Sequence, residues 1–138
     1  KITSIGSNCY FMALSHIAHD CVIADNVIFS NNATLGGHVH IMKNSQVGFS
    51  ATIHQYQVIG SYCMIGMGTV IPRNKKILPG TKWVGNPAKM LGMNDVGLQR
   101  AGISEEDLER ADIFIEIEKK KHAASFQTKS LKLRLPGN

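Results

Sequence analysis

The chain has 138 residues, with 15 Lys or Arg, 10 Asp or Glu and a formal net charge of +5. With 43% hydrophobic and 18% charged residues, its composition is that of one folded domain and not of a disordered chain. It contains no long apolar run and no signal-peptide pattern, which predicts no transmembrane segment and a cytoplasmic protein. The whole excess of positive charge lies in residues 72–103, which excludes a generally basic nucleic-acid-binding surface and indicates a local patch for an acidic partner or anionic ligand.

A step of six residues organises the first part of the chain. Beginning at Ile5, every sixth residue through Trp83 is large and apolar. The fifth place of each hexad, from Cys9 to Thr69, is small except at Gln57. Neither the helical period of 3.6 nor simple strand alternation produces a strict period of six. A solenoid does, with one short strand and one corner per hexad and three hexads per 18-residue coil, so the predicted fold class is an all-β solenoid, a parallel β-helix.

The three cysteines, Cys9, Cys21 and Cys63, all occupy the small fifth place. This position predicts core side chains instead of nucleophiles or metal ligands. Their odd number and irregular spacing argue against a disulfide scaffold and fit a reducing compartment.

The repeat ends near residue 88, which divides the chain into a hexapeptide-repeat β-helix at 1–88 and a C-terminal helical extension at 89–138. In the extension, Ser104 and Asp107 form a capping pair before apolar residues at helical spacing. We therefore expect a helix over about 104–123.

Five of the six histidines lie within a short stretch, and the repeat places several of them on one outer edge. Third-place residues 18 apart stack in successive coils; here they are His19, Gly37, Gln55 and Arg73. Histidine takes up a proton near neutral pH, and the neighbouring Asp20 carboxylate can orient the ring. Gly37 presents a backbone N–H without a side chain in the way, as an oxyanion donor requires. The edge is either a substrate-sized site with His19 as base, or a merely polar edge.

No metal site is predicted from the histidine spacing. Trimeric solenoid enzymes that bind zinc use histidines five residues apart, whereas His16 and His19 are three apart and no pair is five apart. His40 is interpreted as a surface residue, and His122 as the end of the C-terminal helix.

Four segments resemble the UDP-N-acetylglucosamine 3-O-acyltransferase family of lipid A synthesis, and they arrive in the family's order. They are SHIAHDC at 15–21, NNATLGGHV at 31–39, IHQY at 53–56 and GNPAKMLGMNDVGLQRAGIS at 85–104. The resemblance implies a left-handed β-helix, an exception to the usual right-handed crossover, and a homotrimer with active sites between subunits. It implies a β-hydroxyacyl donor on the phosphopantetheine of acyl carrier protein, the 3-hydroxyl of UDP-N-acetylglucosamine as acceptor, and no further cofactor.

The resemblance also implies roles for single residues. His19 matches the general base, Asp20 the carboxylate that supports it, and Gly37 the oxyanion donor. The residues that match substrate-binding positions are His16, His38, His54, Gln55, Asn94 and Arg100. The basic residues expected to dock the acidic carrier protein are Arg73, Lys75, Lys76 and Lys82.

The chain departs from the family at three points. Arg100 is followed by Ala101 where the family often has a second arginine. Met67 stands where many members have a glycine at the end of the acyl groove, so a shorter acyl chain is expected. The family's coils before the position of Lys1 are absent, which indicates a fragment or a reduced relative.

Two other functions stay open at this point. One is an acyl-CoA-dependent sugar O- or N-acyltransferase of the wider hexapeptide-repeat group, in which the NPAK run at 86–89 is common. The other is a truncated solenoid without catalytic activity.

Overall fold

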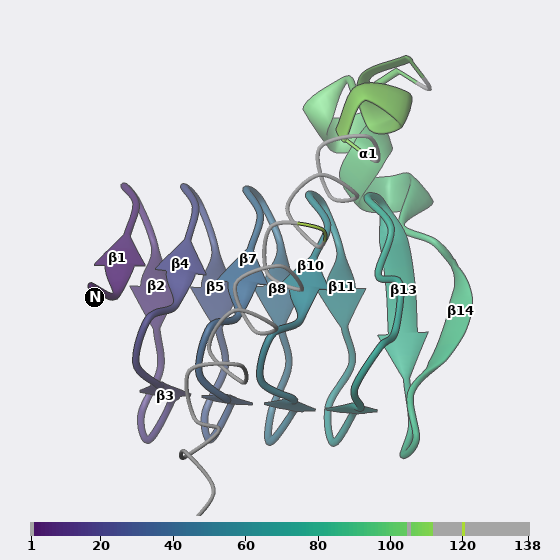
Figure 1. The fold of residues 1–138 in the computed structure, drawn as a ribbon. Coiled ribbons are helices and arrows are strands. Elements are labelled where there is room, and N and C mark those ends of the chain that lie inside the picture. Colours follow the sequence, from purple (N-terminus) through teal and green to yellow (C-terminus); the bar gives the residue numbers. More distant parts are fainter. Residues whose placement is uncertain (1, 105, 112–119, 121–138) are drawn as a thin grey trace, which may run out of the picture.

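The computed structural model describes residues 2–104, 106–111 and 120, and it confirms the predicted solenoid (Figure 1). Twelve two-residue strands, each a sixth-place residue followed by a first-place residue, wind around a common axis. In chain order they are β1 (Ser4–Ile5), β2 (Tyr10–Phe11), β3 (His16–Ile17), β4 (Val22–Ile23), β5 (Ile28–Phe29), β6 (Thr34–Leu35), β7 (His40–Ile41), β8 (Gln46–Val47), β9 (Thr52–Ile53), β10 (Val58–Ile59), β11 (Met64–Ile65) and β12 (Val70–Ile71).

Three parallel sheets form the faces of the coil. Sheet A has the order β1-β4-β7-β10, sheet C has the order β12-β9-β6-β3, and sheet B contains β11-β8-β5-β2. Each strand pairs with the strand 18 residues away, as in the pairing of Ser4 with Val22 and of Val22 with His40. The predicted coil length is therefore confirmed.

The first-place residues fill the interior. From Ile23 to Ile77 these side chains are at most 2% exposed, and Trp83 is 8% exposed. Ile5, in the first coil, is 51% exposed because only one neighbouring coil packs against it. Each two-residue strand thus depends on the coils on both sides for its burial.

The corners share a backbone conformation that the repeat did not reveal. Every fourth-place residue from Asn8 to Gly80 has a positive φ, eleven non-glycine residues and two glycines. Asn, Asp and Gly tolerate this left-handed region best, and they fill eight of these places. The recurrence of Asn at this place was the sequence signal for the conformation.

Polar side chains at the fifth place connect one coil to the next. Cys21 Sγ lies 3.3 Å from the Gly36 carbonyl oxygen, and Ser45 Oγ donates to the Gly60 carbonyl at 2.7 Å. Buried Gln57, the exception in size, donates to the carbonyl of Pro72 by the same 15-residue step. Where the fifth-place side chain carries a donor, it can thus also satisfy a carbonyl of the next coil, which matters because a buried unpaired carbonyl is costly.

The solenoid ends in β13 (Thr81–Val84), which the repeat predicts through Trp83, and is followed by two elements that the sequence analysis did not predict, β14 (Lys89–Met93) and α1 (Asp95–Ala101). Strand β13 extends sheet B and pairs antiparallel with β14. Helix α1 follows and ends at Gly102 with a φ of 65°. The division of the chain at residue 88 stays a prediction, although the part beyond it begins with a strand.

The expected capping pair is confirmed. Asp107 N–H donates to Ser104 Oγ at 3.2 Å, and the Asp107 carboxylate accepts from the Ser104 hydroxyl at 2.8 Å. The Asp107 carboxylate also accepts from the Ser104 backbone N–H at 3.1 Å, and the two hydrogen bonds that it accepts lower the pKa of Asp107. Residues 106–111 are helical, and most of the predicted helix over 104–123 lies outside the described residues. Within the described residues, no helix has the length and apolarity to cross a membrane.

The corner conformation leads to a stability prediction at Ser50, which is exposed and has a φ of 53°. Ser50→Gly removes the left-handed penalty and is expected to raise the free energy of unfolding by about 1 kcal/mol. Ser50→Val, the matched control, is expected to lower it by about 1–2 kcal/mol because a β-branched residue fits this region worst. Urea unfolding measures both. Equal effects of the two substitutions would contradict the proposed cause.

The burial of the thiols leads to a reactivity prediction. Cys63 is 1% exposed, and burial raises the pKa of its thiol to about 11; burial also raises the pKa of Cys21. Since the thiolate is the reactive form, both should resist iodoacetamide in the native protein at pH 8. Intact mass should show one adduct at most, at half-buried Cys9, and three after unfolding. Native-state labelling of Cys63 at the denatured rate would contradict this prediction.

Candidate active site

The predicted column of third-place residues lies at the corner between sheet C and sheet A. We call residues 18–20, 36–38, 54–56 and 72–74 the histidine corner. Backbone hydrogen bonds hold its successive turns together: His38 N–H donates to the His19 carbonyl at 3.0 Å, and Tyr56 N–H donates to the Gly37 carbonyl at 3.0 Å. The backbones that carry the candidate residues are therefore rigidly stacked.

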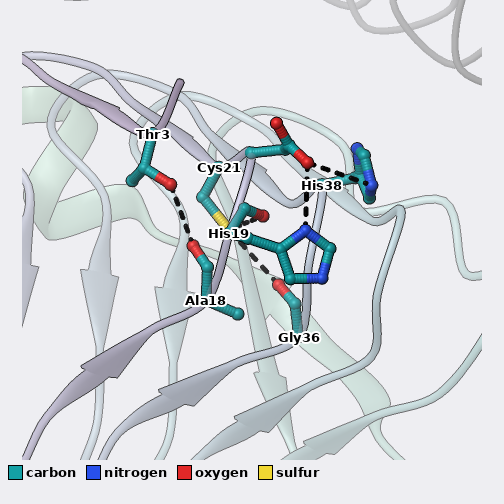
Figure 2. Close-up of polar contacts among 7 residues, drawn as sticks. Thr3, Ala18, His19, Cys21, Gly36 and His38 are labelled. Atoms are coloured by element: carbon teal, nitrogen blue, oxygen red, sulfur yellow. Dashed lines mark hydrogen bonds and ion pairs between the residues drawn. The ribbon is translucent and has the colours of Figure 1, made fainter. Parts of the chain in front are cut away.

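Two histidines from adjacent coils converge on one carboxylate, as Figure 2 shows for His19 and His38. His19 Nδ1 lies 3.0 Å from Asp20 Oδ2, and His38 Nε2 lies 3.6 Å from the same oxygen. The two rings meet edge to face with their centroids 5.1 Å apart. With Nδ1–H donated to Asp20, the His19 Nε2 carries a lone pair and can accept a proton. These three residues are also a group whose donor atoms lie within 4.8 Å of one another.

Gly37 lies directly beneath the His19 ring. A Cβ added at Gly37 would be 2.7 Å from both Cε1 and Nε2 of His19, so only glycine leaves room for the ring in this position. At Gly36, by contrast, an added Cβ would be 2.6 Å from the backbone nitrogen of Gln55. Gly36 is therefore required by the packing of the coil, and Gly37 by the ring of His19, the candidate base.

The ring of His38 is held from its other side by Tyr56. The two rings stack with centroids 4.5 Å apart and an interplanar angle of 4°. Tyr56 was not among the predicted site residues, although it belongs to the IHQY segment, and its place 18 residues after His38 was the available signal. His54 and Gln55 are exposed on the same turn, and His54 Nδ1 lies 3.0 Å from the Gln55 carbonyl oxygen.

His16 lies one strand before His19. It occupies the outward place of β3 on sheet C, pairs with Thr34 and is exposed. The structure therefore places His16 beside the histidine corner, on the adjoining face.

Other predicted residues occupy different corners within a single chain. Met67 is 76% exposed at the corner between sheets B and C. Asn94 donates from Nδ2 to the carbonyl of Tyr62, at the corner between sheets A and B. Arg100 is exposed in the last turn of α1. One chain therefore does not bring these residues to His19.

The four predicted carrier-docking residues also divide between faces. Arg73 belongs to the histidine corner, and Lys75 and Lys76 follow it toward sheet A. Lys82 instead lies on β13 of sheet B, where it pairs with Met64. The basic cluster beside the histidine corner thus contains three of the four residues.

The coil, the repeat and the relatives define the class of protein: a left-handed parallel β-helix of the hexapeptide-repeat type. A family model described as bacterial transferase hexapeptide (six repeats) matches residues 2–37. Within this class the chain is similar to acyl-[acyl-carrier-protein]–UDP-N-acetylglucosamine O-acyltransferases, so the resemblance of its four segments is confirmed.

Three relatives show the extent of this similarity. The acyltransferase of Alkalilimnicola ehrlichii is 40% identical over 113 residues, 80% of this chain and 43% of the relative. That of Aliarcobacter butzleri is 43% identical over 109 residues, 79% of this chain and 41% of the relative. The solved UDP-N-acetylglucosamine acyltransferase from Campylobacter jejuni is 38% identical with a TM-score of 0.68, covering 77% of this chain and 41% of that structure. The chain spans about two fifths of the curated relatives it matches.

The two adjacent glycines provide a matched pair of substitutions. The methyl group added in Gly37→Ala meets the His19 side chain, which can rotate, so we expect the fold to persist and the His19 ring to move away from Asp20. Gly36→Ala meets backbone, so we expect it to lower the free energy of unfolding by about 1–3 kcal/mol. Thermal unfolding and the imidazole NMR signals of His19 measure the two effects. Unmoved His19 signals in Gly37→Ala would contradict the proposed contact.

Proposed function

We propose that the protein transfers a β-hydroxyacyl chain from acyl carrier protein to the 3-hydroxyl of UDP-N-acetylglucosamine, the first step of lipid A synthesis. The names of the relatives support this activity over the matched part of the chain. The observation that carries the proposal is the packing of His19 between the Asp20 carboxylate and the Gly37 backbone. The proposed base thereby lies next to its orienting carboxylate and to the backbone of the proposed oxyanion donor.

In the proposed reaction, His19 Nε2 removes the proton from the acceptor hydroxyl while Nδ1–H stays with Asp20. The acceptor oxygen attacks the thioester carbonyl carbon and forms a tetrahedral oxyanion. The Gly37 N–H, which donates none of the hydrogen bonds found among the described residues, stabilises this oxyanion. When the intermediate collapses, the C–S bond breaks and the His19 imidazolium returns its proton to the carrier thiolate.

A complete site on this proposal requires more than one copy of the chain. The histidine corner, Met67 and Asn94 occupy three different corners of one coil, so neighbouring copies must supply the missing faces. This arrangement supports a homotrimer with active sites between subunits, in which His16, His38, His54 and Gln55 hold the sugar nucleotide or acyl group. Arg100 and Asn94 would then approach the nucleotide and the phosphopantetheine from an adjacent copy.

The acyl chain length is proposed to depend on Met67. Its exposed side chain follows Gly66, where an added Cβ would be 2.9 Å from a methyl group of Val84. A flexible apolar side chain at the end of an acyl groove shortens that groove. The proposed preference is therefore for a short acyl chain.

The proposed docking surface for the carrier is the basic cluster of Arg73, Lys75 and Lys76, which adjoins the histidine corner. Positive charge there steers an acidic carrier toward His19. Lys82, on another face of the coil, contributes to this surface only through a neighbouring copy. The reaction needs no cofactor beyond the phosphopantetheine of the donor, and the three free thiols fit the proposed cytoplasmic location.

The test is the transfer rate of the 138-residue chain with acyl carrier protein loaded with graded acyl chains and with UDP-N-acetylglucosamine. His19→Ala is expected to lower kcat by about 10²–10⁴-fold, because it removes the general base. His40→Gln, on the outer face of sheet A, is the matched control and should retain native activity.

Undiminished transfer by His19→Ala would overturn the assignment of the base. Transfer from acyl-CoA at a higher rate than from the carrier would replace the proposed donor with the alternative one. If the native chain neither transfers an acyl group nor binds UDP-N-acetylglucosamine, that result would favour a non-catalytic solenoid.

A further inference from the structure

The group formed by His19, Asp20 and His38 has the composition of a metal site. Two imidazole nitrogens and one carboxylate oxygen form a donor set that binds Zn²⁺ and other late first-row divalent ions in proteins. His19 Nδ1 and His38 Nε2 lie 3.0 Å and 3.6 Å from Asp20 Oδ2, and each of the three residues offers one ligand atom within 4.8 Å of those of the other two. Ligands at tetrahedral Zn²⁺ are about 3.3 Å apart, so small ring rotations suffice.

The structure holds two of the three donors in place and leaves the third accessible. The side chains of Asp20 and His38 are 14% and 16% exposed, whereas that of His19 is 72% exposed. The ring of His38 is stacked on Tyr56, and its backbone is hydrogen-bonded to His19. An ion can therefore enter from the His19 side and meet donors whose orientation is already restricted, which favours binding.

This juxtaposition was not visible in the histidine spacing. A separation of five residues occurs between no two histidines, so no metal was predicted from the sequence. His38 instead follows His19 by 19 residues, one coil plus one place, and the shared corner brings the two rings together.

We propose that His19, Asp20 and His38 bind one late first-row divalent cation, such as Zn²⁺, per chain. Metal binding does not depend on the proposed function, whereas its consequence for catalysis rests on that function. An ion on His19 Nδ1 leaves the ring proton on Nε2, so the ring has no lone pair for the acceptor hydroxyl. The bound ion is thus an inhibitor that competes with the Asp20–His19 hydrogen bond, and not a cofactor of the transfer.

The experiment is a titration of the tag-free, chelator-treated chain with Co²⁺, followed by its visible d–d absorption, and then displacement of Co²⁺ by Zn²⁺. We expect one equivalent per chain. The most informative variant is His38→Asn, which removes one ligand and should leave the fold intact. Asparagine already occupies the same left-handed corner place at Asn8, Asn26, Asn32, Asn44 and Asn74. We expect its affinity for Co²⁺ to fall at least tenfold, as in His19→Ala, whereas the control His40→Gln should bind as the native chain does.

Two results would overturn the site: no d–d spectrum from the native chain, or equal Co²⁺ affinity in the native chain and in folded His38→Asn. Far-UV circular dichroism and the melting temperature establish that the variant is folded. Transfer activity is measured in parallel with and without Zn²⁺. Metal binding by a chain that transfers no acyl group would refute the proposed function alone, and transfer without metal binding would refute this inference alone.

Discussion

Hydrogen bonds between successive coils decide which residues of this chain meet. Strands of two residues are far too short to be stable alone, and each persists because the strand 18 residues away pairs with it in the same register. The exposure of Ile5 and the burial of Ile23, residues of the same type at the same place in successive coils, show the effect of a missing neighbour. Every feature of the candidate site follows from this register, because it places third- and fourth-place residues of one coil against those of the next.

The corners combine a strained backbone conformation with rigid support. In many proteins a non-glycine residue with positive φ marks a functional site. Here Asp20 and His38 share that conformation with all other fourth places, so it belongs to the coil and is not evidence of catalysis. What distinguishes the histidine corner is side-chain chemistry: an imidazole held by a carboxylate, a glycine that makes room for the ring, and a second imidazole stacked on Tyr56.

The predicted residues are spread over three corners of the coil, so a single chain does not bring them together. A solenoid uses its interior for stacking and leaves only its outer faces and corners for chemistry. Met67, Asn94 and the histidine corner are therefore kept apart by the same geometry that keeps each of them rigid. The proposed site between copies would reunite corners that the coil separates, and the basic cluster that begins at Arg73 lies beside one of them.

The sequence by itself determined the period, the solenoid class, the burial of Cys21 and Cys63 and the column that contains His19 and Gly37. These are consequences of a strict six-residue step, which sets inward and outward places without reference to any long-range contact. The tertiary structure decided the rest. It brought His38 to Asp20 from the next coil, stacked it on Tyr56, turned Asn94 toward Tyr62 and formed β14 and α1, none of which the repeat encodes. The physical reason is that a hexad specifies where each backbone lies, whereas ring orientation and the chain beyond the repeat depend on neighbours that meet only when the coils stack.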